Sequence, residues 1–146
     1  LKNVANLAPK IKYGDLVYIA MRDSEQPEQY LLKKYKVKNF PPAEIRKRGV
    51  ERIAIDALKY LQNCDLIYVS FDVDALDSSV SKGTGTPVPQ GITEREAGNL
   101  VARLMCSEKV CGFEIVEVNP TLDKENLMAE NAFEILLRAT NSLVND

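Results

Sequence analysis

Two aspartates, Asp72 and Asp74, lie two residues apart at the end of the apolar stretch LIYVSF. Side chains at positions i and i+2 of a strand point to the same side, so the two carboxylates are expected to converge. At a separation of about 5 Å they repel by roughly 3 kcal/mol at an effective dielectric constant near 20. A hard divalent cation removes this repulsion, because carboxylate oxygens suit Mg²⁺, Mn²⁺ and Ca²⁺. The pair predicts a metal site, with solvated turn acids as the open alternative.

Acidic side chains also follow two other apolar stretches. The sequence RDSE (22–25) comes after GDLVYIAM (14–21), and Glu114 and Glu117 lie in and after VCGFEIVEV (110–118). Ligands of open parallel sheets bind outside the carboxyl ends of the strands. We therefore expect these acids to gather at one edge of a sheet.

Strands and helices alternate along the chain. Predicted strands cover 14–21, 36–40, 65–73 and 110–118. Predicted helices begin near Pro27 and cover 50–62, 93–105 and 127–143, the third opening with a Thr93–Glu96 capping box. Such alternation predicts an α/β fold, a three-layer αβα arrangement with a mostly parallel sheet, in a single unit over residues 1–146. The nearly continuous apolar character of 65–73 predicts a strand covered on both faces.

Several smaller expectations follow from the same patterns. On the last helix we expect five residues to face inward: Ala132, Phe133, Ile135, Leu136 and Leu137. The basic segment EIRKRGVER (44–52) is interpreted as a solvated helix face rather than a nucleic-acid site. The three cysteines, Cys64, Cys106 and Cys111, have no CxxC spacing and are interpreted as reduced, buried thiols of a cytoplasmic protein.

The overall composition excludes several classes of function. The formal net charge is −2, which favours neither nucleic acid nor an anionic membrane surface as a partner. No apolar run approaches the roughly 20 residues of a membrane helix. The 146-residue sequence contains no histidine, so no mechanism in which this chain supplies an imidazole applies. Because the sequence also begins with Leu1, we expect it to be part of a longer protein.

The motifs SFDVDALD (70–77), GTGTPV (83–88) and EVNP (117–120) together resemble the arginase–agmatinase, or ureohydrolase, family. Within the family the sequence is most similar to arginases, since MRDSEQPEQYLL (21–32) resembles their arginine–aspartate segment. The resemblance covers nearly the whole chain but only the C-terminal half of the family's domain. It implies a binuclear manganese centre, incomplete in this chain, that releases urea from a small guanidino substrate. Arginine is the expected substrate, with agmatinase and formimidoylglutamase activities as alternatives.

The resemblance also implies roles for individual residues. Asp72 and Asp74 correspond to metal ligands, Glu117 to the group that holds the guanidinium, and Thr86 to the pocket wall. Three acids would lie near the substrate's amino-acid end: Asp23, Glu25 and Glu28. We further expect the complete protein to be a homo-oligomer.

The sequence departs from the family pattern at three positions. Glu25 stands where arginases usually have Asp, Ser78 replaces a common Pro, and Gln90 replaces a common Gly. The family's histidine ligand and its Asp-x-His-x-Asp motif precede the matched region. Two of about six metal ligands are therefore present, and the isolated chain is predicted to be inactive.

Parts of the same motifs also resemble two other kinds of site. The stretch FDVDALDSS also resembles the haloacid-dehalogenase phosphatase signature, in which Asp72 is the nucleophile and Asp74 the acid, but Gly-Thr-Leu normally follows there. The stretch KGTGTP lacks the Lys-Ser/Thr and the helix of a P-loop, so Gly83 and Gly85 are interpreted as meeting a loop's dihedral needs. A stable half-domain with no activity remains a third possibility.

The resemblance finally implies two strand pairs with a missing neighbour between them. Strand 14–21 should pair with 36–40, and strand 65–73 with 110–118. Either direct pairing of 14–21 with 65–73 or a second copy of the chain would satisfy the inner edges. Direct pairing is favoured because it needs no second molecule.

Overall fold

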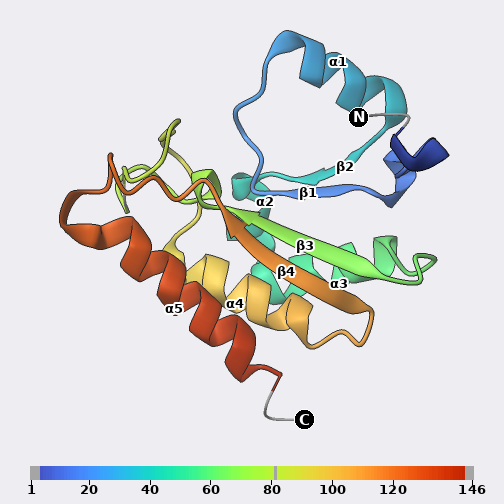
Figure 1. The fold of residues 1–146 in the computed structure, drawn as a ribbon. Coiled ribbons are helices and arrows are strands. Elements are labelled where there is room, and N and C mark those ends of the chain that lie inside the picture. The colour runs from blue at the N-terminus through green and yellow to red at the C-terminus, as the bar shows by residue number, and fades with distance from the viewer. Residues whose placement is uncertain (1–3, 81, 144–146) are drawn as a thin grey trace.

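The computed structural model describes residues 4–80 and 82–143. The strands are β1 (Val17–Ile19), β2 (Lys38–Phe40), β3 (Ile67–Asp72) and β4 (Val110–Val116) (Figure 1). The α-helices are α1 (Gln26–Tyr35), α2 (Pro42–Arg48), α3 (Val50–Tyr60), α4 (Glu94–Met105) and α5 (Leu127–Asn141). Short 3-10 helices are η1 (Val4–Asn6), η2 (Tyr13–Asp15), η3 (Val73–Ala75) and η4 (Lys124–Asn126).

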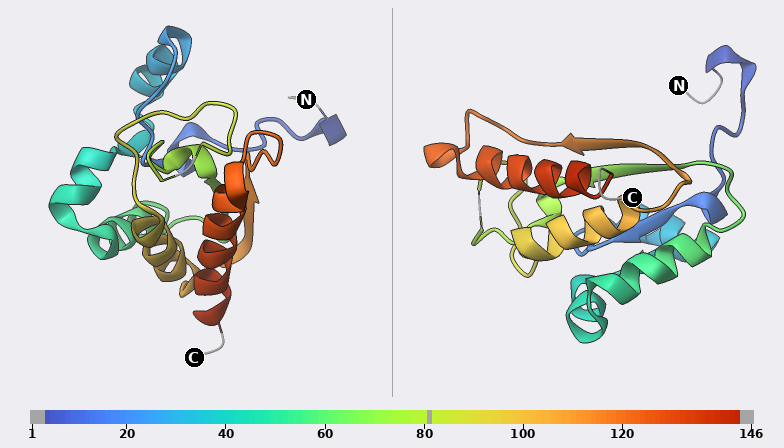
Figure 2. Two further views of the ribbon diagram at one scale, coloured as in Figure 1. Left: turned by 90° about the vertical axis from the view of Figure 1, so that its left-hand side faces the viewer. Right: turned by 90° about the horizontal axis from the view of Figure 1, so that it is seen from below.

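The elements form three layers. Helix α4 packs against both α3 and α5, so these three helices make one continuous row. In the left view of Figure 2, α1 lies at the top, α4 and α5 lie at the bottom, and the strands lie between them. The predicted αβα arrangement is confirmed, and the carboxyl ends of all four strands point to the left in Figure 1.

The strands form two separate parallel pairs, β1–β2 and β3–β4. Both predicted pairings are therefore confirmed. The favoured direct pairing of β1 with β3 is wrong, since no ladder joins the two pairs within the described residues. Side chains from both strand pairs contribute instead to one hydrophobic core. Arg22, after β1, and Arg46, on α2, also donate hydrogen bonds to the loop that follows β3. These contacts hold the pairs side by side without bringing their backbones into hydrogen-bonding distance.

The core lies between the strands and the row of helices. Its most buried large side chains include Phe40, Ile53, Ile92, Met128 and Ile135. Removing each such side chain from water stabilises the fold by about 1.5–3 kcal/mol. The core thus backs the strands whose carboxyl ends carry the predicted site.

Helix α5 and strand β3 are less covered than their apolar sequences predict. Ala132 and Ile135 are buried as expected, but Phe133 is 57% exposed, and Leu136 and Leu137 are also exposed. On β3, residues alternate, and the exposed set includes Tyr68 at 60%. The prediction of full coverage is wrong for the described residues because the helix row covers one face of β3–β4 only. No cysteine is fully buried either, since Cys64 is half-buried and Cys106 and Cys111 are exposed free thiols.

Local sequence accounts for the ends of the helices. The predicted capping box of α4 is present: Thr93 Oγ1 accepts from Glu96 N at 3.1 Å and Glu96 Oε2 accepts from Thr93 N at 2.8 Å. Helix α5 begins where the carboxylate of Asp123 accepts from the backbone N–H groups of Met128 and Ala129, at 2.8 and 2.9 Å. Such caps satisfy N–H groups that have no partner within a helix.

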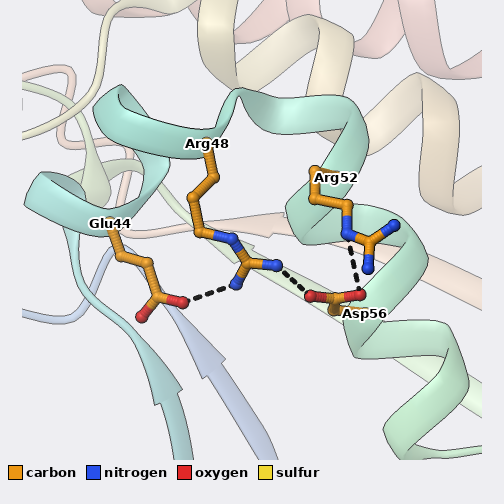
Figure 3. A network of polar contacts seen from close by, with 4 residues as sticks. All are labelled: Glu44, Arg48, Arg52 and Asp56. Atoms are coloured by element: carbon orange, nitrogen blue, oxygen red, sulfur yellow. Dashed lines mark hydrogen bonds and ion pairs between the residues drawn. The ribbon is translucent and has the colours of Figure 1, made fainter.

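The basic segment 44–52 spans two helices, and three of its four basic side chains, Arg46, Lys47 and Arg52, are exposed as a solvated helix face predicts. Gly49, with φ of 79°, divides it into α2 and α3. Arg48 joins the two helices by pairing with Glu44 at 2.6 Å and with Asp56, and Arg52 also pairs with Asp56 at 3.3 Å (Figure 3). The network holds α2 at an angle to α3.

No helix among the described residues is long and apolar enough to cross a membrane.

Gln90 has a left-handed backbone conformation, with φ of 67°. A side chain at this φ costs roughly 1–2 kcal/mol, while glycine adopts it freely but loses more entropy on folding. We expect Gln90→Gly to raise the free energy of unfolding by about 0.5 kcal/mol, which a denaturant titration can measure. Gln62→Gly is the matched control at an exposed residue outside the positive-φ set, and it should lower the stability. A loss of stability in Gln90→Gly equal to that of the control would contradict this account.

Candidate metal and substrate site

Asp72 and Asp74 lie at the carboxyl end of β3. Asp72 is the last residue of the strand, and η3 begins at the next residue. Asp72 Oδ1 accepts a hydrogen bond from Asp74 N at 2.8 Å, so the first carboxylate caps the turn that carries the second. The tight turn keeps the two acids at the same edge of the sheet.

Two threonine hydroxyls orient Asp74. Thr84 Oγ1 donates to Asp74 Oδ1, and Thr86 Oγ1 donates to Asp74 Oδ2. Thr84 is only 2% exposed and is the one buried polar residue among residues 4–80 and 82–143. The sequence prediction named Thr86 and missed Thr84, although the i, i+2 spacing in GTGT was a signal that both could reach one partner. Each carboxylate oxygen has two acceptor sites, so Asp74 keeps sites for a cation beside these bonds.

Asp77 anchors the loop that carries the threonines, and sequence analysis did not single it out. Its carboxylate accepts from Ser79 N at 2.9 Å, from Ser79 Oγ at 2.5 Å and from Gly91 N at 3.0 Å. These bonds, above all that from the Ser79 hydroxyl, lower the pKa of Asp77. The spacing Asp-x-Ser is typical of an Asx turn and could have indicated this role.

Glu117 directly follows β4, the strand paired with β3. Its φ of 68° is uncommon for a residue with a side chain, and such conformations cluster at functional sites. The carboxyl group of Asp72 is partly buried, and this burial raises the pKa of Asp72. The negative charges of Asp74 and Glu117 raise the pKa further, while the hydrogen bond from Asp74 N lowers it. The carboxylate of Asp72 is therefore close enough to those of Asp74 and Glu117 to be repelled by each of them.

The loop after β4 also contacts the threonine loop. Asn119 N donates to Gly83 O at 2.8 Å. A Cβ atom on Gly83 would lie 2.6 Å from Met128 Cβ and 2.7 Å from Asp123 Oδ1. Gly83 is thus required by close packing rather than by its dihedral angles, which corrects the sequence interpretation. Neither explanation applies to Gly85, which lacks a positive φ and has open space around it.

The three acids predicted near the substrate's amino-acid end lie between β1 and α1. Asp23 is exposed and follows Arg22, whose guanidinium contacts the Asp74 loop. Glu25 and Glu28 form the capping box of α1, with Glu25 N donating to Glu28 Oε2 at 2.9 Å. No contact joins Glu25 or Glu28 to Asp72 or Asp74 among the described residues. Their predicted role therefore stays a prediction.

The carboxylates at this edge have the chemistry of an incomplete site for a hard cation. No ion pair among residues 4–80 and 82–143 involves Asp72, Asp74 or Glu117, and their repulsion is the condition that a bound cation relieves. Oxygen ligands suit Mn²⁺. In the same part of the chain, no three histidine, cysteine or acidic side chains converge tightly enough to hold a metal ion. The two carboxylates provide oxygen ligands of the kind a hard divalent cation prefers, as part of a larger ligand set.

Comparison with known proteins identifies the family. The model of the arginase family matches residues 4–141. The chain belongs to the arginase family. An arginase of Brevibacillus brevis is 37% identical over 137 residues, which are 93% of this chain and 46% of that protein. The arginase-family chain thus spans about half the length of the curated relatives it matches.

Solved structures agree with this family assignment. The crystal structure of Bacillus subtilis arginase has a TM-score of 0.87 at 34% identity, over 94% of this chain and 48% of that one. The formimidoylglutamase of Bacillus subtilis also has a TM-score of 0.87, at 29% identity, over 93% of this chain and 43% of that one. The resemblance stated from the motifs is confirmed, and the arginase family is favoured over the phosphatase alternative. Two activities within the family share this fold.

Proposed function

We propose that this chain is the C-terminal part of a manganese-dependent hydrolase of guanidino compounds, most consistent with arginine hydrolysis to ornithine and urea. One observation carries the proposal: an arginase-family chain places the Asp72–Asp74 pair at a sheet edge, with Thr84 and Thr86 orienting Asp74. Asp72 and Asp74 would hold manganese, which would supply a water of lowered pKa for hydrolysis of the guanidinium. Two ions per complete site are proposed.

Each residue of the site has a distinct proposed task. Asp72 and Asp74 hold metal, and the threonine hydroxyls fix the orientation of Asp74, as outer partners of metal ligands commonly do. Glu117 holds the guanidinium by charge-assisted hydrogen bonds, for which a carboxylate is suited. Glu117 would thereby fix the orientation of the guanidinium carbon towards the attacking water.

The acidic start of α1 is proposed to recognise the other end of the substrate. Asp23, Glu25 and Glu28 provide negative charge that would attract an α-amino group. Glu25 is one methylene longer than the Asp that arginases usually have. This difference keeps two alternative substrates: agmatine, which differs from arginine at this end, and formimidoylglutamate, whose reacting group is formimidoyl rather than guanidino.

The remaining ligands are proposed to come from a preceding segment of the complete protein. The inner edges of β1 and β3 lack a ladder partner among the described residues, and a parallel strand between them would join the two pairs. We further propose that the complete enzyme is cytoplasmic, because the three cysteines of this chain are free thiols. We also propose that it is a homo-oligomer.

The test compares arginine, agmatine and formimidoylglutamate as substrates of the complete protein with Mn²⁺. We expect the highest kcat/KM with arginine. The isolated 146-residue chain serves as a control and should release no urea, because it lacks histidine and most of the ligand set. A higher kcat/KM with agmatine would overturn the arginase assignment, and inactivity of the complete protein towards all three substrates would support a non-catalytic member of the family.

A further inference from the structure

The side chain of Arg22 crosses from the end of β1 to the loop that carries the proposed metal ligand. Its Nε donates to Pro89 O at 3.0 Å, and its Nη1 donates to Asp74 O at 3.0 Å and to Ala75 O at 3.5 Å. Its Nη2 donates to Leu76 O at 3.1 Å and to Val88 O. The five N–H groups of the guanidinium thus have five carbonyl partners.

These carbonyls belong to the two arms of a single loop. One arm, 74–76, begins at Asp74 itself, and the other arm, 88–89, begins two residues after Thr86. The backbone joins the arms through Ser78 N to Val88 O at 3.3 Å and Asp77 N to Ile92 O at 2.9 Å. Arg22 therefore holds together the segment that carries the ligand and the segment that orients it.

Arg46 of α2 supports the far end of the same loop. Its Nη2 donates to Gln90 O at 3.0 Å and to Gly91 O at 2.7 Å. Arg46 contacts neither Asp74 nor the 88–89 arm in the described structure. Of these two arginines, only Arg22 contacts Asp74, the proposed metal ligand.

The geometry of this contact requires arginine. The guanidinium is planar and presents its donors as a rigid fork, whereas the lysine ammonium concentrates its donors at one point. Burial lowers the pKa of Arg22, while the charges of Asp77, Asp23 and Asp74 act in the opposite direction. The guanidinium stays charged and compensated at this half-buried position.

We propose that Arg22 is a positioning residue that holds Asp74 and Thr86 in the arrangement that binds the metal, and that it ties this loop to the substrate-recognition segment 23–28. The inference rests on the proposed function for the identity of the metal. All five hydrogen bonds of Arg22 go to backbone carbonyls of the loop. Arg22 acts through the backbone of the ligand loop.

The test uses Arg22→Lys in the complete protein, with Arg52→Lys as the matched control at an exposed arginine on α3. Substitution of a residue that orients a metal ligand typically lowers the metal affinity by about 10–100-fold. We expect Arg22→Lys to raise the Kd for Mn²⁺ at least about tenfold, to speed amide hydrogen exchange at Asp77 and Ser78, and to leave exchange in α5 unchanged. At saturating Mn²⁺ its kcat should largely recover, whereas a general loss of packing would not respond to metal. The control should match the wild type in all readouts.

An unchanged Kd and unchanged exchange in Arg22→Lys would overturn the inference. If Arg22→Lys does not fold, exchange in the wild-type, metal-free protein decides instead. The amides of Asp77 and Ser78 should then be protected before any metal is added, and fast exchange there would overturn the preformed loop. A wild-type protein that binds no Mn²⁺ would overturn the proposed function. Even then, amides of Asp77 and Ser78 that are protected in the wild type and exchange faster in Arg22→Lys would support the role of Arg22 in holding the loop.

Discussion

Replacement of Glu117 by Gln is expected to lower kcat/KM of the complete enzyme by about 10³-fold, or about 4 kcal/mol, with manganese content unchanged. The change keeps the shape of the side chain and removes the negative charge that is proposed to hold the guanidinium. Metal content after desalting, by elemental analysis, and steady-state kinetics with arginine measure the two effects.

Glu114→Gln is the matched control for Glu117→Gln. Glu114 is an exposed acid of β4, three residues before Glu117. It should retain nearly full activity. Loss of manganese in Glu117→Gln would make Glu117 a metal ligand and would show that its proposed role is wrong.

Replacement of Asp72 by Asn is expected to have opposite effects on metal binding and on the stability of the metal-free protein. The substitution removes one of the two proposed ligand charges, so we expect the Kd for Mn²⁺ to rise by about 100-fold or more and activity to fall with it. The asparagine oxygen can still accept from Asp74 N, so the turn should persist.

The stability effect follows from the pKa of Asp72, which burial and the charges of Asp74 and Glu117 raise. A raised pKa in the folded state means that the folded protein disfavours the ionised form, so the carboxylate lowers stability at pH 7 and this loss disappears as the pH falls through the raised pKa. Without metal, Asp72→Asn should therefore have a higher Tm than the wild type at pH 7, and the difference should vanish in acid. Asp65→Asn, at the exposed amino end of the same strand region, should change neither metal affinity nor this pH dependence. A lower Tm for metal-free Asp72→Asn at pH 7 would contradict the electrostatic account.

Local pattern was sufficient for most of the secondary structure. The four strands, the Thr93–Glu96 cap and helices α3, α4 and α5 follow from apolar periodicity and capping residues, with ends within a few residues of the prediction. Helix α2 was not predicted as a separate helix. The break between α2 and α3 depends on the backbone conformation of one residue, Gly49. The apolar periodicity of α5 predicted more buried residues than the structure has. Periodicity shows that a helix has an apolar face, but it does not show whether the same chain contains an element that covers this face.

The sequence alone determined the family, the Asp72–Asp74 pair, the role expected of Thr86 and the pairing of each strand with its neighbour. These features depend on residues that are close in the chain or on motifs long enough to be specific. Tertiary structure alone decided that the two strand pairs stay apart, that Thr84 shares Asp74 with Thr86, and that Arg22 holds the loop from 52 residues away. Such contacts depend on where the chain returns in space, and a single sequence does not encode that return in any local pattern.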